Sequence, residues 1–297
     1  TKSLAAFFTG STSMTAEAIH SFADCGNQIL LLFGMKKAAA PASELHPLGY
    51  GKVSYFWSFM VALMLFSVGG VFSVYEGSHK LLHPQPLERP WIAVGVLFVG
   101  LVLESFSLFG ALKEIRHTRG SRSLYRWFKD TRQSELMVVV GEDIAALLGL
   151  AIALLFVALA LVTGNPLFDA VGSIAIGLLL ITIATMMTLE IKSLIIGESA
   201  DDEFKAGLTD FFARKYPGVE LLNLITQHHG RDIVLAIKAT FKKWPASARA
   251  LVDAINAIER DIRSEFSAVR FIFFEPDVKT AEKTLPKAKK SRTLKRK

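Results

Sequence analysis

Long runs of hydrophobic residues, separated by short polar segments, fill the first two thirds of the chain. A transmembrane helix needs about 20 predominantly apolar residues. Because the chain begins with Thr1 and not with Met, we expect that an N-terminal part precedes it. The pattern predicts six transmembrane helices, the first of them truncated: one ending near residue 10, then 13–36, 54–79, 91–112, 136–162 and 167–196.

After residue 197 the hydrophobic positions follow shorter, amphipathic patterns. Segments 197–216 and 247–266 have the period of amphipathic helices, and three apolar runs between and after them are typical of strands: 219–226, 233–241 and 269–276. The order α-β-β-α-β predicts a small α+β domain with its helices on one face of a sheet. We therefore expect three parts: a transmembrane domain, an α+β domain and a basic disordered tail, at 1–197, 198–278 and 279–297.

Composition supports a membrane protein, and the distribution of basic residues predicts on which side of the membrane each loop lies. Hydrophobic residues make up 51% of the chain, which is more than an ordinary soluble domain carries. Basic residues concentrate in the loops after the second and fourth predicted helices, and the positive-inside rule makes these loops and both termini cytoplasmic. A bacterial inner membrane is the first expectation and an organelle membrane the second. The basic residues of the longer loop are Lys113, Arg116, Arg119, Arg122, Arg126, Lys129 and Arg132.

The net charge of +7 comes from the tail, because 279–297 holds nine basic residues and one acidic residue. The rest of the chain is close to neutral, so the charge does not indicate binding to nucleic acid. A solvated tail is one interpretation, and contact with anionic lipid headgroups is the other.

Ionisable residues interrupt two of the predicted transmembrane helices. His20 and Asp24 lie one helical turn apart in the second, and Glu142 and Asp143 are adjacent in the fifth. Ionisable groups at membrane depth are costly and mark ion pathways. Imidazole and carboxylate are ligands of first-row divalent metals, and a cation offsets the repulsion between buried carboxylates. Together the two segments predict a metal site within the membrane.

Several motifs resemble the cation diffusion facilitator family over nearly the whole chain. The stretch TGSTSMTAEAIHSFADCGNQ resembles its second-helix signature, HPLGYGKVSYFWS its HPxGxGK segment, and NPLFDAVGSIAIGLLL its sixth helix. The α-β-β-α-β pattern is similar to its ferredoxin-like cytoplasmic domain. The resemblance implies six transmembrane helices, a homodimer with the lipid bilayer around it, and export of a divalent metal in exchange for protons.

The resemblance also identifies the metal ligands, with one departure from the family pattern. Relatives usually carry HxxxD in the fifth helix, whereas this chain has Val139 four residues before Asp143. A subgroup of zinc-transporter relatives shares the Glu-Asp variant. The implied ligands are His20, Asp24 and Asp143. We add Glu142 as a fourth, with a role in proton relay as the alternative.

Other polar residues allow two interpretations each. Glu104 either lines the transport path or makes an interhelical hydrogen bond, and Asp169 fits the N-terminus of the sixth helix without any metal. His46 lies where some relatives bind a second metal, but Tyr50 replaces the other histidine of that segment.

Two further sites are expected to be inert. His228 and His229 are expected in a solvated hairpin turn around 229–232, without a metal. Cys25, the only cysteine, is expected to be a small buried hydrophobe, with a metal ligand as the alternative.

We therefore predict a secondary-active exporter of a divalent metal, with zinc as the first choice. Manganese, iron or cobalt is the alternative, and a non-transporting member that acts in assembly or metal sensing is another. No enzyme is expected, because the sequence has no nucleotide-binding loop, HExxH motif or nucleophile elbow. No cofactor is expected either, since the metal is the substrate.

Overall fold

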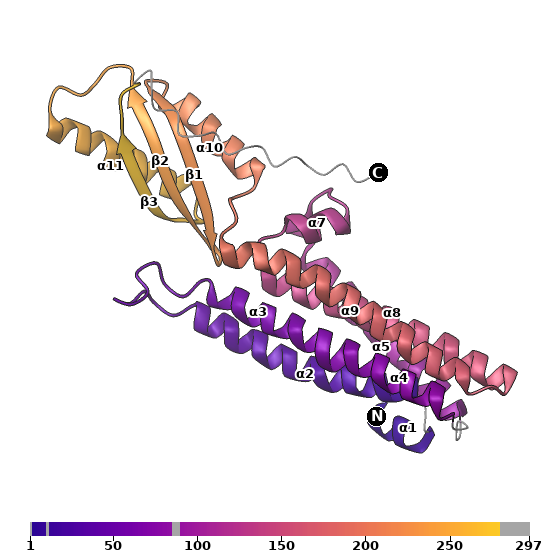
Figure 1. Cartoon of the computed structure of the whole chain (residues 1–297). Coiled ribbons are helices and arrows are strands. Elements are labelled where there is room, and N and C mark those ends of the chain that lie inside the picture. The colour runs from indigo at the N-terminus through magenta and orange to yellow at the C-terminus, as the bar shows by residue number, and fades with distance from the viewer. Residues whose placement is uncertain (1, 10–11, 85–89, 280–297) are drawn as a thin grey trace. The chain divides into compact units, whose positions relative to one another are not determined.

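A computed structural model describes residues 2–9, 12–84 and 90–279 (Figure 1). The chain forms two compact units. The first contains the chain up to Glu198 together with the hairpin tip His228–Arg231, and the second contains Ser199–Gln227 and the residues from Asp232 onward. The predicted tail lies outside the described residues, apart from Lys279, and the predicted domain boundaries stay predictions.

Helices make up most of the described residues of the first unit, and loops and the hairpin tip make up the rest. A π-helical segment, η1, joins α3 to α4 without a break in the helix. The helices are α1 (Lys2–Thr9), α2 (Thr12–Ala38), α3 (Val53–Met64), η1 (Leu65–Val71), α4 (Phe72–Leu82), α5 (Pro90–Glu114), α6 (Arg116–Arg119), α7 (Leu124–Asp130), α8 (Ser134–Thr163) and α9 (Leu167–Ile196).

Four stretches of helix among the described residues are long and apolar enough to cross a membrane: Val53–Leu82, Trp91–Glu114, Ser134–Thr163 and Leu167–Ile196. They confirm the last four predicted transmembrane helices. Helix α2 has 27 residues, which is long enough to cross a membrane. Polar residues within it, among them His20, Asp24 and Asn27, lower its hydropathy. That α2 crosses the membrane therefore stays a prediction.

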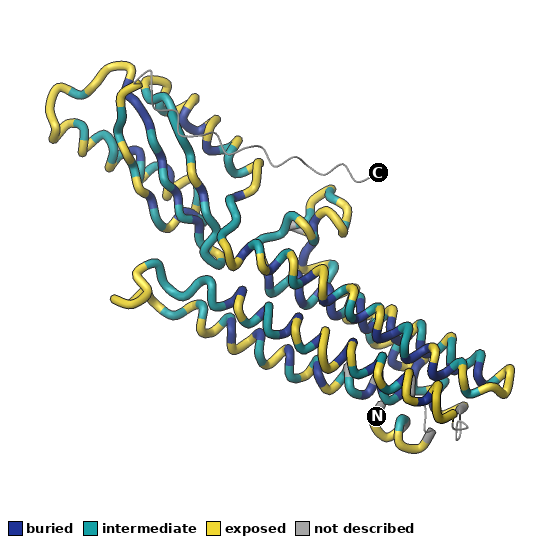
Figure 2. Tube along the Cα trace, in the orientation of Figure 1, coloured by how far each residue is buried: buried dark blue, intermediate teal, exposed yellow. Residues whose placement is uncertain are grey.

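Buried small and apolar residues hold the helices of this unit together (Figure 2). Glycines let α9 approach η1 and α4 closely, as small residues do in membrane helix pairs. A Cβ added at Gly177 would lie 2.7 Å from the Gly70 carbonyl oxygen, and one at Gly77 would lie 2.8 Å from the Ala170 carbonyl oxygen. The α4–α9 pair is therefore packed backbone against backbone.

An ion pair also joins α4 to α9. The Lys80 ammonium lies 3.3 Å from an Asp169 carboxylate oxygen, and the two side chains are 7% and 0% exposed. The sequence placed Asp169 correctly in the first turn of α9, but it gave no indication of this partner. A buried carboxylate in an apolar helix pair is thus paired with a lysine.

Two short helices that the sequence analysis did not predict fold the connector between α5 and α8. Trp127 of α7 is buried against Ile115 and Val140, so it fastens the connector to the adjoining helices. Ser123 accepts a hydrogen bond from the backbone N–H of Arg126 and caps α7.

The second unit has the predicted order: α10 (Asp202–Lys215), β1 (Val219–His229), β2 (Asp232–Phe241), α11 (Ala248–Glu265) and β3 (Val269–Pro276). Asp201 and Ser247 cap the two helices through their side chains. The sheet order is β1-β2-β3, with β2 and β3 parallel across the α11 crossover. The α+β prediction is confirmed.

One face of the sheet carries the core of this unit. Alternate residues of β2, from Ile233 to Ala239, are buried in a cluster with apolar residues of both helices. The Tyr216 hydroxyl donates to Asp261 of α11. This bond lowers the pKa of Asp261, and burial, with the carboxylate beside it, raises the pKa of Tyr216 to about 12.

Candidate metal site

Helix α2 presents a stripe of polar side chains at helical spacing. Asp24 is half-buried, and Asn27, three residues later, is fully buried. His20 lies in the same helix, one turn before Asp24. The side chain of His20 lies outside the described residues, so its predicted role as a ligand stays a prediction.

Helix α8 contributes the adjacent carboxylates. Glu142 is 6% exposed and Asp143 is half-buried. Neighbouring residues of a helix point about 100° apart, and the two carboxylates accordingly have different partners. Asn27 of α2 donates its amide N–H to Glu142 over 2.6 Å. Ser107 of α5 donates to Asp143 over 3.4 Å.

These helices enclose a cavity of about 250 Å³, called the α2–α8 cavity below. Three of the four predicted ligands, Asp24, Glu142 and Asp143, line it. Glu104 lines it as well, and this supports the first of its two interpretations. The complete lining is Ser21, Asp24, Cys25, Gln28, Glu104, Ser107, Val139, Glu142, Asp143 and Ala146.

The donor set of the cavity suits a cation. Four carboxylates converge on a small space within apolar helices, and oxygen ligands of this kind bind divalent metals. Among the described residues, however, no three His, Cys, Asp or Glu side chains already lie in the arrangement of a metal site. The role of these carboxylates as ligands therefore stays a prediction.

Two residues in or beside the cavity, Cys25 and Asn27, differ from their sequence interpretation or were missed. Cys25 is exposed and lines the cavity, so the prediction that it is a buried hydrophobe is wrong. Asn27 belonged to the polar stripe, but the sequence could not show that its amide contacts Glu142, 115 residues away.

The hairpin turn forms where it was predicted, around 229–232, but the expectation that His228 and His229 are solvated in this turn is wrong. Strand β1 continues through His229, the turn is formed by Gly230 and Arg231, and both histidines are half-buried. His229 Nε2 lies 3.2 Å from the Gly49 carbonyl oxygen. A histidine that packs against backbone is shielded from solvent in a way that its sequence position did not suggest.

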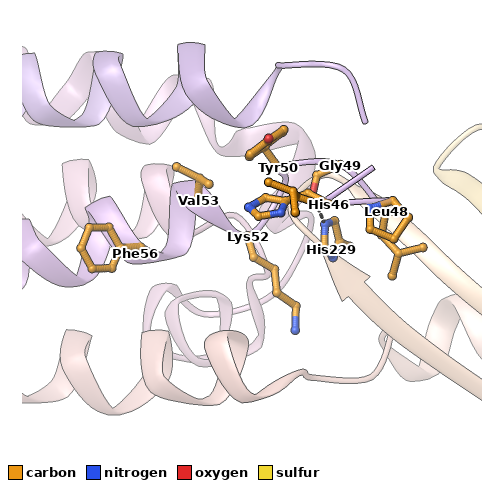
Figure 3. Close-up of a pocket in the computed structure, with 10 residues that line it drawn as sticks. His46, Leu48, Gly49, Tyr50, Lys52, Val53, Phe56 and His229 are labelled. Atoms are coloured by element: carbon orange, nitrogen blue, oxygen red, sulfur yellow. Dashed lines mark hydrogen bonds between the residues drawn. The ribbon is translucent and has the colours of Figure 1, made fainter. Parts of the chain in front are cut away.

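Figure 3 shows the pocket of about 450 Å³ that His46 and His229 line. The His46 ring contacts the Tyr50 ring, with centroids 4.5 Å apart. Together with Lys52 the two histidines are the basic residues of a mostly apolar lining. No trio of metal-ligating side chains occurs here among the described residues.

Comparison with known proteins identifies the family. A model of the cation efflux transmembrane domain matches residues 1–194. The chain is 36% identical over 211 residues to the human proton-coupled zinc antiporter SLC30A9, mitochondrial, covering 70% of this chain and 37% of that protein. It is 31% identical over 192 residues to metal tolerance protein C4 of Arabidopsis thaliana, covering 63% of this chain and 42% of the relative.

A more distant relative is the magnetosome protein MamB of a Magnetospira strain, 23% identical over 202 residues, or 68% of this chain and 64% of that protein. The chain spans less than half the length of its human and plant relatives. The family match covers the segment with α2, α5 and α8, which together form the cavity. The chain belongs to the cation efflux family of multi-pass membrane transporters, the family that its motifs resemble.

Proposed function

We propose that this chain exports a divalent metal, zinc first, from the cytoplasm by secondary-active exchange for protons. The observation that carries the proposal is the α2–α8 cavity, where Asp24, Glu142 and Asp143 line one space inside an apolar helical unit. The similarity to a protein named as a proton-coupled zinc antiporter supports both the metal and the coupling. The ligands in the proposal are His20, Asp24, Asp143 and Glu142.

Proton coupling follows from the chemistry of these ligands. A metal binds deprotonated imidazole and carboxylate, so protons arriving from the opposite side displace it. An unperturbed histidine titrates near pH 6.5, which suits His20 to respond to a modest pH difference across the membrane. A homodimer in a cell or organelle membrane, with the basic loops and both termini in the cytoplasm, completes the proposal.

Zinc uptake into proteoliposomes under a proton gradient tests the function. Purified protein in vesicles loaded with a zinc-sensitive dye should take up zinc when the vesicle interior is acidic, and dissipating the proton gradient should slow the uptake. Zinc uptake equal to that of protein-free vesicles at every gradient would contradict the proposal.

Manganese is a second candidate metal, because every ionisable side chain among the described lining residues is a carboxylate except Cys25. Oxygen-rich ligand sets suit Mn²⁺, whereas imidazole favours zinc. Val139 lines the cavity one turn before Asp143. The Val139→His substitution should therefore widen the zinc-over-manganese ratio in competitive flux at fixed pH.

The matched control for this variant is Val138→His on the same helix, because Val138 is buried and does not line the cavity. Both variants are first checked for a monodisperse folded state. An unchanged ratio in folded Val139→His protein would show that a nitrogen at this position does not reach the metal.

The second unit is expected to fold without metal. Its own residues, 199–227 and 232–279, contain no histidine or cysteine, and its core is a continuous apolar cluster. Isolated residues 198–278 should show cooperative unfolding in the presence of a chelator, and calorimetry should detect no micromolar zinc binding. Stoichiometric zinc binding that is lost in a His228→Ala/His229→Ala variant would show that the hairpin histidines form a metal site.

A further inference from the structure

The hydrogen bond between Asn27 and Glu142 links the two helices that supply the proposed ligands. The amide N–H of Asn27 donates to Glu142 Oε1 over 2.6 Å, and the two residues are 0% and 6% exposed. Asn27 does not itself line the α2–α8 cavity, whereas Glu142 does. Any effect of Asn27 on a cation in the cavity must therefore pass through Glu142.

The amide holds one oxygen of Glu142 and leaves the other without this restraint. The carboxylate has two oxygens, so a single donor fixes its orientation without occupying both. Ser107 does the same for Asp143 from a third helix. The two adjacent carboxylates of α8 thus accept hydrogen bonds from neutral donors on two different helices, α2 and α5.

The neutrality of the donor distinguishes this pair from Asp169, which is also buried among the residues that the structure describes. Asp169 is paired with the ammonium of Lys80, which cancels its charge. A positively charged side chain paired with Glu142 would likewise cancel the negative charge that attracts a metal. An amide orients the carboxylate and adds no positive charge beside it, so the carboxylate remains available to a divalent ion.

An interhelical hydrogen bond can also serve simply to hold helices together. Such bonds in membrane proteins make on average only a small contribution to stability. A purely structural bond would affect stability and leave the affinity for metal unchanged. The two roles therefore make different predictions for transport kinetics.

We propose that Asn27 is a positioning residue for cation recognition: it holds Glu142 at the wall of the cavity without placing a positive charge beside it. The Glu142 carboxylate then serves as a ligand in place of the histidine that relatives carry at the position of Val139. This inference rests on the proposed function, and it deepens the account of the same site. Outer-shell partners of metal ligands typically change metal affinity by about 10–100-fold when they are removed.

The test is metal flux by the Asn27→Leu variant, which keeps the size of the side chain and removes the donor. We expect the KM for zinc to rise about tenfold or more, with the maximal rate within about twofold of the unmodified protein. Because loss of the Glu142 ligand is itself expected to lower flux, the Glu142→Ala background is tested by calorimetry. There the same substitution should leave the affinity for zinc unchanged, since no carboxylate remains to be positioned. If Asn27→Leu does not fold, Asn27→Ser, which is too short to reach Glu142, replaces it.

Ser58→Ala is the matched control. Ser58 is buried and donates to Ser134 of α8 over 2.9 Å, so its loss removes an interhelical bond away from the cavity. Its KM should match that of the unmodified protein. An unchanged KM in the folded Asn27 variant, or an equal loss of zinc affinity by calorimetry with and without Glu142, would overturn the inference. Absence of flux in the unmodified protein would instead overturn the proposed function.

Discussion

Replacing Asp143 by asparagine is expected to abolish metal-dependent flux, and Asp24→Asn is expected to do the same. Each substitution keeps the size of the side chain and removes one negative charge from a cavity of about 250 Å³. An amide oxygen is a much weaker ligand for a divalent ion than a carboxylate. Flux into proteoliposomes under a fixed proton gradient should fall to the level of protein-free vesicles.

The folded state should survive these substitutions. The two carboxylates line the same cavity as Glu142 and Glu104, so removing one of them relieves repulsion between like charges. Thermal stability without metal should therefore be equal to or higher than that of the unmodified protein. Unfolding of either variant would show that the replaced carboxylate is needed for the stability of the fold.

Glu76→Gln provides the control for charge. Glu76 is a half-buried carboxylate in α4 that does not line the cavity. It should transport normally. Near-normal transport by folded Asp143→Asn protein would show that Asp143 is not a metal ligand. An equal loss of flux in Glu76→Gln would show that the assay reports general damage to the protein.

The hydrophobic pattern was sufficient to predict most elements of this protein, because a helix in lipid needs a long apolar run and a strand at a buried face needs alternation. The bounds of β3 were correct, since 269–276 is an apolar run between polar segments. The short helix α7 was missed because Trp127 stabilises it through a tertiary contact. Local periodicity carries no information about such a contact.

The candidate site was partly predictable for the same reason. Helical spacing placed Asp24 on the polar stripe of α2, and the cost of ionisable groups in the membrane directed attention to Glu142 and Asp143. The partners of these groups were not predictable. Asn27 contacts Glu142 across 115 residues of sequence, and only the packing of α2 against α8 brings them together.

In the β1–β2 hairpin, the sequence rule for turns predicted the position of the turn correctly and its solvent exposure incorrectly. Gly and Asp near His229 are typical turn residues, and the turn does occur at Gly230. The rule for turns also suggests solvent exposure. Packing of the hairpin tip against the backbone at Gly51 and the Tyr55 hydroxyl, which donates to the Gly230 carbonyl oxygen over 3.0 Å, removes that exposure.

Breaking the buried ion pair of α4 and α9 is expected to cause a large loss of stability. Asp169→Asn leaves the Lys80 ammonium buried, at 7% exposure, without its carboxylate. Removing one partner of a buried pair costs about 3–5 kcal/mol. In detergent, the midpoint of thermal unfolding, followed by tryptophan fluorescence, should fall by roughly 5–10 °C.

A double substitution separates the ion pair from the packing around it. Lys80→Met/Asp169→Leu removes both charges and keeps similar volumes, so its midpoint should lie near that of the unmodified protein or above it. The control is Asp130→Asn in α7, which breaks an exposed pair with Arg126 (side chains 40% and 75% exposed) and should shift the midpoint little. Since neither Lys80 nor Asp169 lines the α2–α8 cavity, the double variant should still transport metal. If the double variant is as unstable as Asp169→Asn, the loss comes from repacking against the close α4–α9 interface and not from an unpaired buried charge.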